Sequence, residues 1–257
     1  WSSQIEKIWG RIDRMARSFF FIFIFLLYLY PIGILYPQKE IQFEQLGREQ
    51  GVSQATINCI FKDSRGFMWF GTCAGLNRYD GYNLKVYLNN PFDSTSLSNP
   101  YINCIYEDPA DSGRFLWIGN WSGGLDKFDQ DLETFKHYRL QDRNPNSPAV
   151  DNIMDIIKAR DGYLWITTLT GGISRFDPKT ATFKNYSHDP ANPNSLSHYS
   201  THPIIEDRCG LLWVGSEGGG LNCFDPEKEI FIHFLHDPKD PNSLSNNDVW
   251  SLFQDSE

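Results

Sequence analysis

Residues 63–80 read DSRGFMWFGTCAGLNRYD, and this stretch decides the fold because close copies of it return along the chain. Its tryptophan recurs every 48 residues, at Trp69, Trp117, Trp165 and Trp213. Each copy continues with a glycine, an aliphatic residue and an aromatic–aspartate pair. The repeated glycines and aspartates are Gly75, Gly124, Gly172, Gly220, Asp80, Asp129, Asp177 and Asp225. Repetition at a fixed spacing indicates an array of equivalent structural units.

Each unit has the pattern of short β-strands. Apolar and polar residues alternate within the first copy, which predicts strands at 57–62, 67–72, 75–79 and 84–87, with a hairpin turn at 63–66. A unit of this length with four short strands is typical of a β-propeller blade. The sequence therefore predicts an all-β fold, a β-propeller of four-stranded blades, with the repeated indoles packed between adjacent blades.

The repeats also predict how the chain is divided. Blades are expected at about 51–96, 97–149, 150–195 and 196–243, with the start of a fifth at 244–257. Residues 41–46 have the pattern of an outer strand that closes a further blade. Because the pattern begins and stops inside a blade, we expect an incomplete propeller, an N-terminal fragment of a longer protein.

The N-terminal segment has a different pattern. Several Lys and Arg residues precede an unbroken apolar run at 19–30. A basic flank followed by such a run is typical of a secretory signal or a signal anchor. We expect residues 15–37 to be this apolar helix, starting at Met15, and residues 1–14 to be upstream read-through. Cleavage and retention both stay open, because no small-x-small cleavage site is evident.

Composition limits the possible partners. The formal net charge of −9, with no stripe of Lys and Arg, disfavours nucleic acid and an anionic membrane surface. The five cysteines show no Cys-x-x-Cys pair and no metal-ligand spacing, so we expect buried thiols, with a disulfide as the alternative. The sequence predicts neither a metal site nor a cofactor.

The blade pattern resembles the two-component regulator propeller repeat, most closely at 63–80 and 207–226. The segments 51–54 and 97–99, each just before a blade, fit it as well. This resemblance implies the periplasmic sensor region of a hybrid two-component histidine kinase of the inner membrane, homodimeric at full length. It also implies that the sensor detects oligosaccharides and switches on genes of polysaccharide utilisation. The membrane helix, kinase and DNA-binding modules would lie beyond residue 257.

Catalysis by this segment is not expected. The sequence holds no Gly-x-Ser-x-Gly, no His-Glu-x-x-His and no phosphate loop. The aspartates that end each third strand recur in every blade, as turn caps do, whereas glycoside cleavage needs one unique pair of acids. We predict no catalytic residue. An exported lyase or glycoside hydrolase, and a protein-binding propeller, remain the alternatives.

The loops between the second and third strands of the blades are expected to lie on one face of the propeller. Residues on this face that differ from their counterparts in the other blades are the predicted ligand contacts. The indole of Trp121 could stack on the apolar face of a sugar ring. The matching positions in other blades are predicted to be Cys73 or Ala74, Thr170, and Glu217 or Gly218. Polar ligand contacts are predicted from Asn120, Glu217, His198 and Tyr199.

Overall fold

The structure is a computed structural model that describes residues 45–140, 144 and 146–255. The chain divides into two units, residues 1–45 and 46–257, and the second is described below. The expected signal helix at 15–37, the read-through at 1–14 and most of the expected outer strand at 41–46 lie outside the described residues. Over the part that is described, no helix is both long enough and apolar enough to cross a bilayer.

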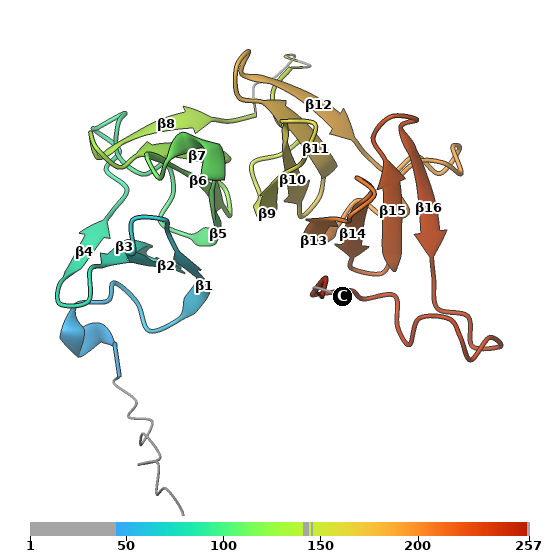
Figure 1. Cartoon of the computed structure of the whole chain (residues 1–257), viewed down its shortest axis with the longest axis horizontal. Helices are drawn as coiled ribbons and strands as arrows, with labels where there is room; N and C mark the ends of the chain where they lie inside the picture. The colour runs from blue at the N-terminus through green and yellow to red at the C-terminus, as the bar shows by residue number, and fades with distance from the viewer. Residues whose placement is uncertain (1–44, 141–143, 145, 256–257) are drawn as a thin grey trace, which may run out of the picture. The chain divides into compact units, whose positions relative to one another are not determined.

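The second unit contains four antiparallel sheets of four strands, each built from consecutive strands (Figure 1). The first two sheets contain β1 (Ile57–Lys62), β2 (Met68–Thr72), β3 (Gly75–Tyr79), β4 (Leu84–Tyr87), β5 (Ile102–Glu107), β6 (Phe115–Asn120), β7 (Leu125–Asp129) and β8 (Thr134–Tyr138). The other two contain β9 (Ile153–Lys158), β10 (Leu164–Thr168), β11 (Gly172–Asp177), β12 (Thr182–Tyr186), β13 (Thr201–Glu206), β14 (Leu212–Ser216), β15 (Leu221–Asp225) and β16 (Ile230–Phe234). The all-β fold of repeated four-stranded units is thereby confirmed.

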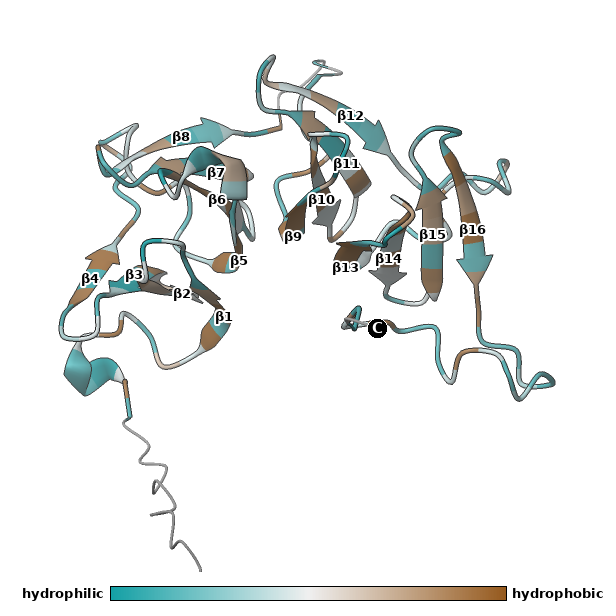
Figure 2. Ribbon diagram, viewed as in Figure 1, coloured by the Kyte–Doolittle hydropathy of each residue, from teal (hydrophilic) through white to brown (hydrophobic). Residues whose placement is uncertain are grey.

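The first strands of neighbouring sheets contact one another in the order β1, β5, β9 and β13. The last strands, β4, β8, β12 and β16, lie at the opposite side of each sheet (Figure 1). We call the first set the inner strands. Hydrophobic residues are concentrated on the strands, and the connecting loops are largely hydrophilic (Figure 2).

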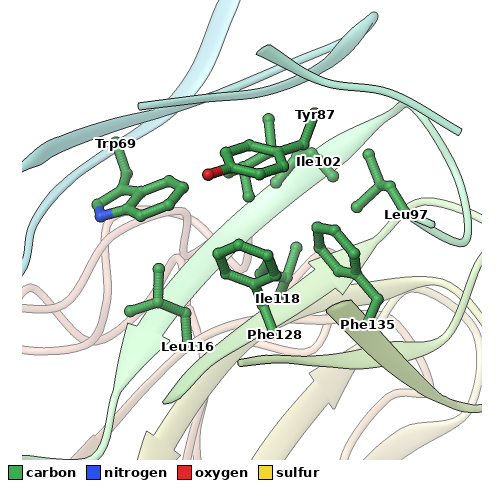
Figure 3. Packing of buried hydrophobic residues seen from close by; sticks show 9 residues of the cluster. Trp69, Tyr87, Leu97, Ile102, Leu116, Ile118, Phe128 and Phe135 are labelled. Atoms are coloured by element: carbon green, nitrogen blue, oxygen red, sulfur yellow. The ribbon is translucent and has the colours of Figure 1, made fainter. Parts of the chain in front are cut away.

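The core lies between sheets rather than within any one of them. One cluster joins Trp69 and Tyr87 of the first sheet to Leu116, Phe128 and other residues of the second (Figure 3). The rings of Trp69 and Phe128 meet edge to face with centroids 5.7 Å apart. The same contact recurs between later neighbours, in the pairs Trp117–Phe176 and Trp165–Phe224. A single blade could not bury its own tryptophan, so the sheets depend on one another.

The linker before a blade is fixed by a side chain of the third strand of that blade, two residues after the glycine that ends the preceding hairpin turn. Asn77 Oδ1 accepts the backbone N–H of Ser53, and Asn222 Oδ1 accepts that of Ser197. In the second sheet a buried carboxylate replaces the amide, and Asp126 Oδ2 accepts the N–H of Ser98. These bonds satisfy buried backbone donors that would otherwise destabilise the fold.

Every inner strand carries a bulge near its first residues. The pairing register shifts between Ile57 and Cys59 in β1 and between Ile102 and Cys104 in β5, and it shifts at the same end of β9 and β13. A bulge leaves one residue outside the ladder and changes the direction of its side chain. Asn58 Nδ2 accordingly reaches the carbonyl of Ile102 on the next inner strand, at 2.8 Å.

Candidate ligand-binding edge

One edge of every sheet is formed by the β2–β3-type hairpin together with the residues just before the inner strand. The hairpin glycine connects adjacent sheets there, because Gly75 N–H donates to Pro100 O and Gly124 N–H donates to Asp151 O. Gly124 has φ 76°, and a Cβ placed on it would lie 2.4 Å from Tyr138 O. Glycine is therefore required where the sheets join at this edge. We call it the hairpin edge.

Trp121 is a partly exposed aromatic side chain on the hairpin edge. It follows β6 directly and is 37% exposed. Its ring lies on that of Tyr101, with centroids 5.4 Å apart and planes at 41°. A hydrogen bond with the Cys73 thiol, together with burial, raises the pKa of Tyr101. The indole therefore contacts Tyr101 and keeps part of its surface exposed.

The structure corrects one part of the repeat alignment around Trp121. The N–H of Trp121 donates to Tyr101 O, and the equivalent bond in the third sheet runs from Leu169 to Asn152 O. Leu169, and not Thr170, therefore occupies the matching position. In the fourth sheet Glu217 occupies it, since its N–H donates to Ser200 O. The position four residues after the repeated tryptophan gives the same assignment, so the prediction of Thr170 was one residue off.

Asn120 does not belong to the exposed surface. It is fully buried, and its Nδ2 donates to Gly124 O at 3.2 Å inside the hairpin. The other sheets place a hydroxyl there that makes the same bond, and these residues are Thr72, Thr168 and Ser216. The predicted ligand contact of Asn120 is therefore withdrawn, because its side chain closes the hairpin.

Glu217 is exposed and stands beside two polar groups of the fourth sheet. Its Oε2 accepts from Ser200 Oγ at 3.3 Å and lies 3.8 Å from His202 Nε2. His202 is buried, and burial lowers the pKa of its imidazole, which is therefore neutral at pH 7. The ring of Trp250 lies 4.4 Å from that of His202. The sequence analysis had singled out neither His202 nor Trp250 as a site residue.

The other two predicted contacts lie in the turn before β13. The rings of His198 and Tyr199 are 4.1 Å apart, and Tyr199 is 48% exposed. The carbonyl of Tyr199 accepts the N–H of Gly172, which places this turn on the hairpin edge. Among the described residues this pair makes no hydrogen bond or ring contact with Trp121, so the edge carries two separate groups of side chains.

A row of residues on the inner strands was missed by sequence reasoning. Asn58, Asn103, Met154 and His202 occupy the bulge positions, and Asn103 Nδ2 donates to Ile153 O at 2.7 Å. The available signal was the tetrapeptide Ile-Asn-Cys-Ile, which occurs at 57–60 and again at 102–105. The sequence analysis considered only the cysteine of this tetrapeptide, whereas its asparagine makes the contact between sheets.

The cysteines and acids show no arrangement for redox or metal chemistry in the part of the chain described. All five cysteines are free thiols, and burial raises the pKa of Cys59 and of Cys104. No group of three His, Cys, Asp or Glu side chains is placed to hold a metal ion within the described ranges. The acids that end the third strands are used in turns, as where Asp225 accepts the N–H groups of Glu227 and Lys228.

Proteins with similar sequences and structures include a histidine kinase and extracellular domains of two-component and one-component systems. Histidine kinase P4 of Formosa agariphila is 36% identical over 75 residues, which cover 29% of this chain and 6% of that protein. The extracellular domain of the hybrid two-component system BT3049 from B. thetaiotaomicron is 29% identical, with a TM-score of 0.68 over 75% of this chain and 26% of that one. The extracellular domain of the one-component system BT4673 from the same organism is 26% identical, with a TM-score of 0.62 over 75% of this chain and 27% of that one.

The chain thus spans about a quarter of the length of these two solved domains. Residues 51–74 match the two component regulator propeller family directly. The copies that follow them keep the tryptophan, the hairpin glycine and the terminal aspartate, with one residue more between tryptophan and glycine than in the first copy. Residues 51–74 are therefore similar to one two component regulator propeller repeat, and the later copies resemble that segment.

Proposed function

We propose that this chain is part of the ligand-sensing propeller of a membrane-bound hybrid two-component histidine kinase, and that its hairpin edge recognises an oligosaccharide. The observation that carries the proposal is the exposed Trp121 lying on Tyr101. At the same position the other sheets have Cys73, Leu169 and Glu217. A structural role shared by all blades would call for the same residue in each, and this position differs in every one.

Sugar rings suit such a surface. Their C–H faces are apolar and pack on an indole, while their hydroxyl groups need directional polar partners. Glu217 offers a carboxylate on the same edge of another sheet, and the His198–Tyr199 pair offers an imidazole and a phenol. The net charge of −9 favours a neutral sugar over one rich in sulfate or uronic acid.

The remainder of the function follows from the likeness to sensor domains. Extracellular domains of two-component systems share this fold, which supports a periplasmic position for the chain. Binding at the hairpin edge would then be passed to a kinase across the inner membrane, in a homodimer, to regulate genes of polysaccharide utilisation. An enzymatic role is weaker, because the recurring acids Asp80, Asp129, Asp177 and Asp225 accept backbone N–H groups in turns.

Oligosaccharide binding can be tested by calorimetry with a panel of neutral oligosaccharides on the wild-type chain. Trp121→Ala should weaken binding of any positive sugar by about tenfold or more, and Trp121→Phe should restore part of the affinity. Tyr82→Ala is the matched control, since Tyr82 is 92% exposed in a β3–β4 turn away from the hairpin edge. The control should bind like the wild-type chain, and unchanged affinity of Trp121→Ala would refute the proposed site.

A further inference from the structure

We propose a second site, separate from the Trp121 surface, in which a small cavity on the inner strands takes the ammonium group of a small organic cation. The cavity has a volume of about 330 Å³ and is lined by residues that include Met154, Asp155, His202, Pro203, Trp250 and Leu252. Its walls come from β9, β13 and the segment that follows the fourth sheet. Pockets of this size are at the small end of those that hold organic ligands.

Asp155 supplies the negative charge of the cavity. At the equivalent register the other inner strands carry the uncharged Cys59, Cys104 and Pro203. Its Oδ2 accepts the N–H of Ile204 at 3.2 Å, and its Oδ1 accepts the N–H of Ile156 at 2.9 Å. A carboxylate can accept about four hydrogen bonds, so each oxygen keeps capacity for another donor.

No positive side chain neutralises this carboxylate within the described residues. Asp155 takes part in none of the ion pairs formed by these residues, and Lys and Arg are missing from the cavity lining. The groups that face it from the packed elements are the thiols of Cys59 and Cys104, both protonated, and the neutral imidazole of His202. A half-buried charge without a partner is costly, and a bound cation would supply the partner.

The remaining walls suit an ammonium group. Trp250 is 61% exposed and packs on one side against His202, which leaves indole surface open to the cavity. An indole attracts a cation placed over its face, and a thioether is a polarizable neighbour. Met154 is held in place by Asn103, whose Nδ2 lies 3.8 Å from its Sδ. Aromatic, thioether and carboxylate groups together recognise alkylated or primary ammonium groups better than neutral or anionic ones.

The site should respond to pH in a defined direction. Burial raises the pKa of Asp155 to about 6, so the carboxylate is ionised at pH 7.5 and largely protonated at pH 5. A cation needs the ionised form. Affinity should therefore rise from pH 5 to pH 7.5 and then level off, a dependence that needs no substitution to measure.

Choline and its neutral isostere 3,3-dimethylbutan-1-ol are the probes, titrated into the wild-type chain by NMR or by tryptophan fluorescence. Choline should bind and the isostere should not. Asp155→Asn should weaken choline binding by about tenfold or more, and Trp250→Ala should weaken it too. Asp240→Asn, which removes an exposed acid of a linker, is the control for charge alone and should have no effect.

Two outcomes would overturn the proposal. One is equal binding of choline and the isostere, and the other is choline binding that Asp155→Asn and a change from pH 7.5 to pH 5 leave unaltered. Trp121→Ala should leave choline binding intact. Failure of the oligosaccharide assay would therefore not affect this result, and the two proposals can fail separately.

Discussion

The indole of Trp69 in the first sheet meets the ring of Phe128 in the second edge to face, at 73° and 5.7 Å between centroids. The equivalent pairs in the next two interfaces have angles of 72° and 63°. Trp69, Trp117 and Trp165 are at most 1% exposed. One residue pair, repeated along the chain, thus forms the centre of each interface between sheets.

Replacement of one of these indoles should therefore strongly destabilise the folded chain. Trp117→Ala is expected to lower the free energy of unfolding by about 3–5 kcal/mol, as for other buried aromatic side chains cut to alanine. Trp121→Ala, four residues along the same sheet, should cost less than about 1 kcal/mol because that ring is partly exposed. Urea denaturation followed by far-UV circular dichroism compares the two. Equal losses would contradict the assignment of Trp117 to the core.

The indole N–H groups suggest a second test. Asp63 Oδ2 accepts the Nε1–H of Trp69 at 2.7 Å, and Asp207 does the same for Trp213. In the third sheet Ala159 stands at the place of that aspartate. Asp161, two residues on, accepts from Trp165 Nε1 instead, at 3.1 Å. The aspartate that accepts the bond thus stands at a different position of the turn, and the buried indole N–H of Trp165 still has a hydrogen-bond partner.

Asp161→Ala should thus leave the Nε1–H of Trp165 without an acceptor and destabilise the chain by about 1–3 kcal/mol. Adding Ala159→Asp should recover most of the loss, because it recreates the arrangement of Asp63 and Trp69. Thermal unfolding of the single and double variants measures this rescue. Ala159→Leu in the same background, which has no hydrogen-bond acceptor, is the control for side-chain size. A double variant no more stable than Asp161→Ala would show that the indole bond contributes nothing.

The repeat made most of the fold predictable. Strands expected at 57–62, 75–79 and 84–87 have those bounds in the structure, because alternation and turn residues agree there. The second strand begins at Met68 rather than Phe67, since Phe67 N–H still bonds the turn through Asp63 Oδ1. Local patterns carried this information because each blade folds from consecutive strands.

The site was harder to predict, for physical reasons. Asn120 looks like a surface amide in the sequence, yet its side chain bonds Gly124 O inside the hairpin. The importance of Asp155, His202 and Trp250 depends on a cavity between segments about 50 and 100 residues apart, which strand periodicity does not report. Trp121 could be predicted because it differs from the residues at the same position of the other repeats. Such a difference is visible in the sequence without any knowledge of which residues are in contact.

Asn120 also yields a stabilising substitution. Its Oδ1 is buried and has no hydrogen-bond partner among the described residues. Thr168 at the equivalent position leaves no such acceptor unpaired, because its hydroxyl donates to Gly172 O at 2.8 Å and accepts the N–H of Gly171 at 3.0 Å. Asn120→Thr should therefore raise the free energy of unfolding by about 1 kcal/mol. Oligosaccharide affinity should stay unchanged. A loss of affinity without a loss of stability would restore Asn120 to the ligand site.

The last prediction concerns a pair that other sheets lack. Asp126 is fully buried, and its Oδ1 lies 2.7 Å from His137 Nδ1, whereas Asn77 and Asn222 occupy the same position in two other sheets. The hydrogen bond to Asp126 raises the pKa of His137 above its ordinary value of 6.5. The nearby Arg139 and partial burial oppose this increase without reversing it.

A histidine whose pKa is raised on folding binds its proton more tightly in the folded state. Its contribution to stability is complete below pH 6.5 and is lost as the pH rises through the raised value. Urea unfolding should thus show lower stability at about pH 8 than at about pH 6. Asp126→Asn, which copies Asn77 and Asn222, should flatten this dependence while keeping the bond to the N–H of Ser98. If the slope between these two pH values is the same in both proteins, the Asp126–His137 pair is not its source.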